Sequence, residues 1–252
     1  MSNPFDLTGK VALVTGGNTG LGQGIALALA EAGADIVSVA LSDSDETVEK
    51  VQAMGRRAAG VQADLTSIEP VGRVVEEALA AMGRIDILVN NAGLIRRADA
   101  IDFSEADWDL VMNINLKTVF FMSQAVARQF LKQGDGGKII NIASMLSFQG
   151  GIRVPSYTAS KSGVAGVTKL MANEWAKHGI CANAIAPGYF ATANTAQLRE
   201  DPVRSAEILG RIPAGRWGDP SDLGGAAVFL ASRASDYVQG AILTVDGGWQ
   251  AR

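Results

Sequence analysis

A tyrosine and a lysine stand four residues apart in the stretch SYTASK, residues 156–161. On an α-helix, positions i and i+4 lie on one face, so Tyr157 and Lys161 are expected side by side. A phenol ordinarily keeps its proton up to a pKa of about 10. An ammonium about 4 Å away favours the phenolate by roughly 4 kcal/mol at an effective dielectric constant near 20, before burial opposes part of the shift. The pair predicts a general acid–base group near neutral pH, and a solvated surface pair is the alternative interpretation.

Seven short apolar runs alternate with longer helical patterns along the 252 residues of the chain. Most of the runs are continuous and rich in Val, Ile and Ala, as strands buried on both faces should be. This alternation predicts an α/β fold, a single-domain, Rossmann-like, doubly wound seven-stranded parallel sheet with helices on both faces. The predicted strands are residues 10–16, 34–41, 58–64, 85–93, 138–144, 180–188 and 241–248.

The composition limits the kinds of partner and the domain organisation. No run of about 18 apolar residues and no apolar segment of a signal peptide is present, so we expect a cytoplasmic protein without a membrane span. Cys181 is the single cysteine, which argues against a disulfide and a cysteine metal site, and no metal is expected. The net charge of −4 argues against nucleic-acid binding. Residues 1–252 are expected to form one domain, with the long stretch 191–218 as a lid over its site.

The first predicted strand leads into TGGNTGLG, residues 15–22, and a helical pattern follows. Gly16, Gly20 and Gly22 allow a tight turn, a close approach of backbone to a pyrophosphate, and close helix–strand packing. The N–H groups at the start of the helix would face that anion. A glycine-rich loop between a strand and a helix in the first βαβ unit predicts a dinucleotide-binding site.

The end of the second predicted strand bears on the choice between NAD and NADP. An acid there binds the adenosine ribose of NAD, whereas a basic residue binds the extra phosphate of NADP. The two usual positions, Ala40 and Leu41, are uncharged, and Thr19 in the glycine loop is not basic. Asp43 is interpreted as a solvated loop residue rather than a substitute acid. The lack of a basic residue here favours NAD.

The later strands deliver small or polar residues to the same edge of the sheet. Asp64 is expected to accept a hydrogen bond from the adenine amino group. The small residues of NNAG, 90–93, should let the backbone lie against the cofactor. Thr192 is expected to hold the nicotinamide carboxamide. The residues expected to contact the cofactor are Gly16, Asn18, Thr19, Gly20, Leu21, Gly22, Ala40, Leu41, Asp64, Leu65, Asn91, Ala92, Gly93, Tyr157, Lys161, Pro187, Gly188, Phe190 and Thr192.

Together, TGGNTGLG, NNAG, NINLK, NIAS, YTASK and PGYFAT resemble the motifs of the short-chain dehydrogenase/reductase family, in order and approximate spacing, over nearly the whole chain. The resemblance implies an oxidoreductase with a catalytic tetrad of Asn115, Ser144, Tyr157 and Lys161. It also implies that Lys161 binds the nicotinamide ribose and that Asn115 anchors a water leading protons to Lys161. A homotetramer is implied as well, with the helix bearing Tyr157 and the preceding helix packed across a two-fold interface.

The expected chemistry is hydride transfer between the nicotinamide and a carbonyl carbon. In reduction, Tyr157 gives its proton to the developing alkoxide, and in oxidation the tyrosinate removes one. Ser144 would hydrogen-bond the same oxygen.

Segments outside these motifs, including NNAGLIRRADA, FFMSQA, LMANEWAKHGI and RSAEILGRIPAGRW, resemble members of the family that act on deoxy sugar acids. This implies reduction of 3-deoxy-D-glycero-2,5-hexodiulosonate by NADH to 2-dehydro-3-deoxy-D-gluconate, in the breakdown of pectin-derived uronates. Such a substrate needs a cation for its carboxylate and polar groups for its hydroxyls. Arg96, Arg97 and Arg153 are candidates for the carboxylate and Gln149 for the hydroxyls, while a surface role stays open for each arginine.

Two other interpretations stay open. One is another short-chain reductase, such as a gluconate or polyol dehydrogenase, or a 3-oxoacyl-thioester reductase that would prefer NADPH. The other is a nucleotide-binding sensor without catalysis, which would not need Ser144 and Tyr157 together. His178, the single histidine, is expected to have a helix-capping or surface role.

Overall fold

A seven-stranded parallel sheet forms the centre of the protein in a computed structural model that describes residues 3–251. The strand order is β3-β2-β1-β4-β5-β6-β7, which confirms the doubly wound parallel arrangement predicted from the sequence. The order reverses between β1 and β4, the point at which open sheets of this kind bind ligands. The strands are β1 (Val11–Thr15), β2 (Asp35–Ala40), β3 (Ala58–Gln62), β4 (Ile87–Asn90), β5 (Gly137–Ile142), β6 (Ile180–Pro187) and β7 (Ile242–Val245).

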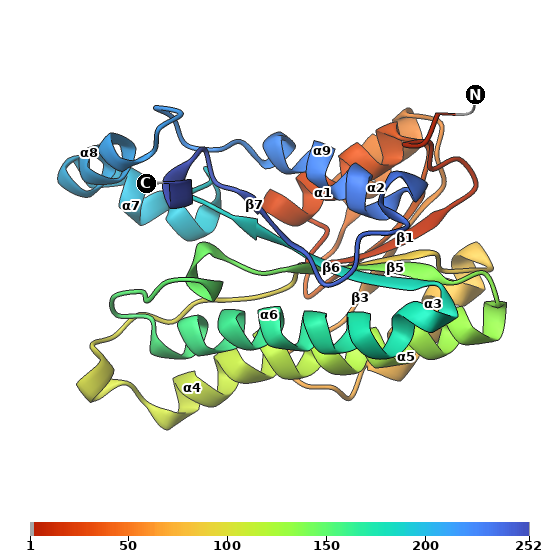
Figure 1. Cartoon of the computed structure of the whole chain (residues 1–252), viewed down its shortest axis with the longest axis horizontal. Helices are drawn as coiled ribbons and strands as arrows, with labels where there is room; N and C mark the ends of the chain where they lie inside the picture. The colour runs from red at the N-terminus through yellow and green to blue at the C-terminus, as the bar shows by residue number, and fades with distance from the viewer. Residues whose placement is uncertain (1–2, 252) are drawn as a thin grey trace.

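Two layers of helices cover the sheet, because its central strands are apolar on both faces. Every residue of β1, β2, β4 and β6 is buried. Figure 1 shows α5 and α6 along one face and α1 and α9 along the other. The helices are α1 (Gly20–Glu31), α2 (Asp45–Ala53), α3 (Val71–Met82), α4 (Glu105–Met112), α5 (Thr118–Gln133), α6 (Pro155–Trp175), α7 (Ala196–Glu200), α8 (Pro202–Arg211) and α9 (Gly224–Ala231).

A π-helical turn, Asn113–Lys117, joins α4 to α5 into one long run, Glu105–Gln133. This run is long and apolar enough to cross a membrane by length and composition alone. The core helices of soluble proteins also meet these two criteria. Here α4 packs against α6 and α5 packs against α3, which is the environment of a core helix.

The segment 191–218, expected as a loop over the site, is largely helical. It contains the short turn Ala193–Thr195, then α7 and α8. The Asp201 carboxylate accepts hydrogen bonds from Val203 N and Arg204 N at the start of α8, and Pro202 occupies its first turn. Ile208 and Ile212 are buried at its other end. His178 is exposed in a short turn after α6, which confirms its surface position.

Candidate active site

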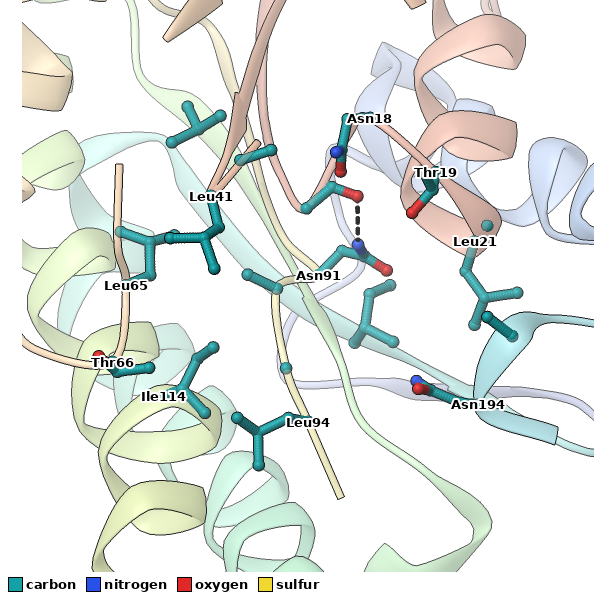
Figure 2. Close-up of a pocket in the computed structure, with 18 of the residues that line it drawn as sticks. Asn18, Thr19, Leu21, Leu41, Leu65, Thr66, Asn91, Leu94, Ile114 and Asn194 are labelled. Atoms are coloured by element: carbon teal, nitrogen blue, oxygen red, sulfur yellow. Dashed lines mark hydrogen bonds between the residues drawn. The ribbon is translucent and has the colours of Figure 1, made fainter. Parts of the chain in front are cut away.

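A cavity of about 480 Å³ runs along the carboxyl ends of β1 to β4, at the switch in strand order (Figure 2). The loops after these strands form one wall, and residues 192–194 form another. In Figure 2, Asn18, Thr19 and Leu21 lie on one side of the cavity and Leu41 and Leu65 on another. Tyr157 and Lys161 reach the cavity from α6.

The glycine-rich loop and the end of β4 form a cradle with no room for side chains. Gly16 has a φ of +61°, and a Cβ there would lie 2.8 Å from Asn91 Nδ2. Asn91 Nδ2 donates to the carbonyl oxygens of Thr15 (3.0 Å) and Gly16 (3.1 Å). Thr19 gives α1 no side-chain cap, so the first N–H groups of the helix remain for an anion. This cradle fits the pyrophosphate of a dinucleotide.

The end of the cavity beyond β2 and β3 is the one at which the sequence predicts the adenosine of the cofactor. Ala40, Leu41 and Asp64 line it as expected, together with Ser42. Asn18 Nδ2 donates to Ser42 Oγ at 2.9 Å. Thr66 donates to Asp64 through its N–H (2.9 Å) and hydroxyl (2.7 Å), which lowers the pKa of that carboxyl and keeps it ionised. Among the residues that line the cavity, only Lys161 is basic.

Four residues expected at the cofactor lie outside the cavity lining. Gly22 is packed behind it, where a Cβ would overlap the Gly16 carbonyl oxygen. Gly188 packs against Asp246, and Pro187 ends β6. Phe190 is buried in the core beside Gly218. These residues support the walls of the cavity rather than line it.

Several residues that line the cavity carry no separate signal in the sequence. Most of them neighbour predicted positions along the chain, whereas Ile114 and Asn194 come from segments whose approach depends on the fold. The residues missed are Val39, Ser42, Ala63, Thr66, Leu94, Ile114, Ile142, Ala193 and Asn194.

Asn115 lies fully buried in the π-helical turn and holds the loop after β4. Its Oδ1 accepts from Leu94 N, and its Nδ2 donates to Leu94 O, both at 2.9 Å. Nδ2 also lies 3.3 Å from Ser160 Oγ. Both ends of the amide are therefore engaged within the protein, and the water expected at Asn115 remains a prediction.

Ser144 lies beside Tyr157 and Lys161, the two residues of α6 that line the cavity. Ser144 follows β5, and its Oγ accepts from Leu146 N at 3.1 Å. Lys161 is buried, donates to the Ile142 carbonyl oxygen at 2.6 Å, and has its Nζ 5.6 Å from the centroid of the Tyr157 ring. Tyr157 is half-buried, with one side on the cavity.

Burial, rather than the neighbouring ammonium, dominates the electrostatics of this cluster. Burial raises the pKa of Tyr157 above its usual 10, although a side-chain hydrogen bond to Ser144 and the charge of Arg97 oppose the rise. Burial also lowers the pKa of Lys161 to about 8. The direction of the Tyr157 pKa shift is opposite to the one expected from the Lys161 ammonium alone, because burial disfavours the charged phenolate.

The three arginines considered for the substrate differ in their partners. Arg96 pairs with Asp107 at 3.2 Å, and Arg153 pairs with Asp99 at 2.9 Å. Arg97 has no carboxylate partner among residues 3–251, and donates to the Asn194 carbonyl oxygen at 3.3 Å instead. Of the three arginines, Arg97 is the one whose positive charge acts on the Tyr157 phenol, and it lowers the pKa of that group.

Gln149, expected to bind sugar hydroxyls, lies outside the cavity lining. It is partly buried beyond Ser144, and its backbone N–H bonds the Met145 carbonyl oxygen.

Comparisons with known proteins agree with this geometry. A family model described as Enoyl-(Acyl carrier protein) reductase matches residues 16–250. The chain is 68% identical over 250 residues to the 2-dehydro-3-deoxy-D-gluconate 5-dehydrogenase of Dickeya dadantii (strain 3937), covering 99% of each chain. It is 68% identical over 248 residues to the protein of the same name from Escherichia coli (strain K12), covering 98% of each.

A solved structure shares the fold over almost the full length. It is a gluconate 5-dehydrogenase from Burkholderia cenocepacia J2315 in complex with NADP and tartrate, 42% identical with a TM-score of 0.93, covering 99% of this chain and 98% of that one. With the parallel sheet, the glycine cradle and the Tyr157–Lys161 pair on one cavity, these matches lead to one conclusion. The chain belongs to the short-chain dehydrogenase/reductase family of oxidoreductases.

Proposed function

We propose that this protein reduces the 5-keto group of 3-deoxy-D-glycero-2,5-hexodiulosonate with NADH to give 2-dehydro-3-deoxy-D-gluconate, and catalyses the reverse oxidation. The name shared by the relatives at 68% identity supports this substrate. The observation that carries the proposal is the placement of Tyr157 on the cavity with the Lys161 Nζ 5.6 Å from its ring centroid, an acid and a cation suited to the reduction of a keto group.

The chain's own residues account for the proton and the positioning. When bound, the dihydronicotinamide supplies the hydride. A Tyr157 phenol that keeps its proton at neutral pH donates it to the substrate oxygen as charge builds there. The Ser144 hydroxyl hydrogen-bonds the same oxygen. The Lys161 ammonium, fixed by the Ile142 carbonyl, stabilises the tyrosinate left behind.

The cofactor is proposed to be NAD(H) rather than NADP(H). A 2′-phosphate needs a cation beside it, and the adenosine end of the cavity offers Leu41, Ser42 and Asn18 instead. The relative from Burkholderia holds NADP, so the two nucleotides must be compared directly.

A substrate panel tests the activity. The purified protein is mixed with NADH or NADPH and with the deoxy hexodiulosonate, 5-keto-gluconate or a simple ketose, and the loss of reduced-nucleotide absorbance is followed. We expect the highest kcat/KM with NADH and the deoxy keto acid. Faster reduction of 5-keto-gluconate would replace the proposal with a gluconate 5-dehydrogenase. No turnover with any member would favour the nucleotide sensor.

Arg97 is proposed as the ligand of the substrate carboxylate, in place of Arg96 and Arg153, whose guanidinium groups already hold carboxylates. A charge-assisted hydrogen bond contributes about 1.5–3 kcal/mol. Arg97→Met should therefore raise KM for the acid by roughly 10- to 100-fold, with little change in NADH affinity. Arg96→Met and Arg153→Met are the matched controls. Equal KM values for the wild type and Arg97→Met would contradict the assignment.

A further inference from the structure

Helix α8 continues the segment that lines the cavity at residues 192–194, and it rests on a small apolar cluster of its own. Met145 lies in this cluster and directly follows Ser144. The cluster is separate from the two large cores under the sheet. Its members are Met145, Tyr189, Leu198, Ile208, Ile212, Trp217 and Trp249. The position of α8 relative to Ser144 therefore depends on how this cluster packs.

Trp249 is the aromatic centre of the cluster and is 5% exposed. The guanidinium carbon of Arg211, at the end of α8, lies 4.1 Å from the centroid of the Trp249 ring, within cation–π distance. Tyr189, after β6, has its ring centroid 4.8 Å from that of Trp249 and contacts Trp217 edge-on at 5.5 Å. Figure 1 shows the C-terminal turn that bears Trp249 beside α7, close to α8.

The backbone around Trp249 is held on the sheet side and fitted closely to the end of α8. Asp246, directly after β7, accepts from Gly248 N (2.9 Å) and Gln250 N (3.0 Å), which fixes the turn that presents the indole. Gly247 O accepts from Ala214 N at 2.9 Å. A Cβ at Gly247 would lie 2.9 Å from Ile212 Cγ2. The turn is thus a platform anchored to β7, and it is contacted by Arg211 at the end of α8 and by Ile212 and Ala214 directly after the helix.

We propose that Trp249, with Arg211 stacked on it, is a positioning residue of the reaction. The stack holds α8, and through it the 192–194 wall, at a set distance from Ser144. The inference rests on the proposed function, because it assumes that the substrate acid binds between this wall and Ser144. Among the described residues, the indole Nε1 has no hydrogen-bond partner, so the ring acts by packing and cation–π contact.

Two pairs of variants separate positioning from general stability. Trp249→Leu and Arg211→Met remove the stack, whereas Trp249→Phe and Arg211→Lys retain an aromatic face and a cation. Trp175→Leu, at the far end of α6, is the matched control for the loss of an indole. Loss of the stack should raise KM for the sugar acid about two- to fivefold, as the strength of a cation–π contact with an exposed cation indicates. The conservative variants should recover most of this loss, and the control should leave KM unchanged.

Two further measurements do not depend on turnover. NADH affinity, followed by its fluorescence, should fall less than the affinity for the sugar acid, because the glycine cradle is remote from α8 and only the 192–194 wall of the cavity is displaced. Amide hydrogen exchange in the NADH-bound protein should accelerate within residues 192–214 and stay unchanged in β1, β4 and β5.

The possible results distinguish a failure of the positioning role from a failure of the proposed function. An unchanged KM, or exchange that accelerates throughout the sheet with a parallel loss of NADH affinity, would overturn the positioning role. If the wild type fails to turn over the deoxy keto acid, the proposed function fails. The local exchange change in Trp249→Leu and its recovery in Trp249→Phe then still decide whether the stack holds the 192–194 wall.

Discussion

At the scale of single residues, burial sets which protons Tyr157 and Lys161 hold. A phenol with a raised pKa is protonated at neutral pH, and a lysine with a pKa of about 8 remains mostly charged there. This combination suits proton donation to a carbonyl oxygen. The tyrosinate required for the oxidising direction forms less readily, so turnover in the oxidising direction should rise with pH.

Tyr157→Phe tests the acid directly, because it removes one oxygen and keeps the ring. General acid catalysis contributes typically 10²- to 10⁴-fold, so turnover should fall by about that factor. NADH affinity should hardly change, since the cradle of the pyrophosphate is elsewhere. Steady-state kinetics and NADH fluorescence titration measure the two quantities, and turnover at the wild-type level would refute the assignment.

Lys161 should weaken the fold below its own pKa. Its pKa is about 8 in the folded protein against the ordinary 10.5, which corresponds to a cost of about 3 kcal/mol for burying the ammonium. The cost is fully present below pH 8 and disappears as the pH rises to 10.5, because the folded protein then holds the neutral amine. The wild type should therefore gain stability relative to Lys161→Met between pH 8 and 10.5. Urea unfolding at several pH values measures both stabilities. A constant difference in the free energy of unfolding between the two proteins over this range would contradict the burial of the ammonium.

At the scale of elements, the cofactor cradle depends on the close fit of α1 against the glycine loop. Gly22 touches the Gly16 carbonyl so closely that a methyl group would displace the loop. Asn91 ties the same loop to β4. A disturbance at Gly22 is therefore transmitted to both walls of the pyrophosphate site.

Gly22→Ala should weaken NADH binding at least tenfold and lower the melting temperature. Gly72→Ala in α3 is the matched control, because a Cβ at Gly72 meets nothing within 4 Å. The control should gain about 0.5–1 kcal/mol of stability, since alanine is the better helix former. Calorimetry and NADH titration distinguish the two variants. Equal melting temperatures and NADH affinities in both would show that the close approach of Gly22 to the Gly16 carbonyl has no role in the cradle.

At the scale of the whole molecule, α5 and α6 leave apolar side chains facing outward. Leu131 and Leu170 are both exposed, at 50% and 44%. Exposed apolar residues on neighbouring helices suit an interface between copies, in line with the homotetramer that the family resemblance implies. Light scattering should give four times the chain mass of 26.2 kDa, whereas a single chain mass would exclude this assembly.

The sequence by itself determined the positions of the strands along the chain and their parallel arrangement, the glycine cradle and the pair on α6. These features follow from local patterns: apolar runs, glycines where a side chain cannot fit, and the i, i+4 spacing of Tyr157 and Lys161. The choice of Arg97 over Arg96 and the stacking of Arg211 on Trp249 came only from the tertiary structure. So did the raised pKa of the phenol. Each depends on which side chains the fold brings together and on how far it excludes water from them. The spacing of residues along the chain contains neither kind of information.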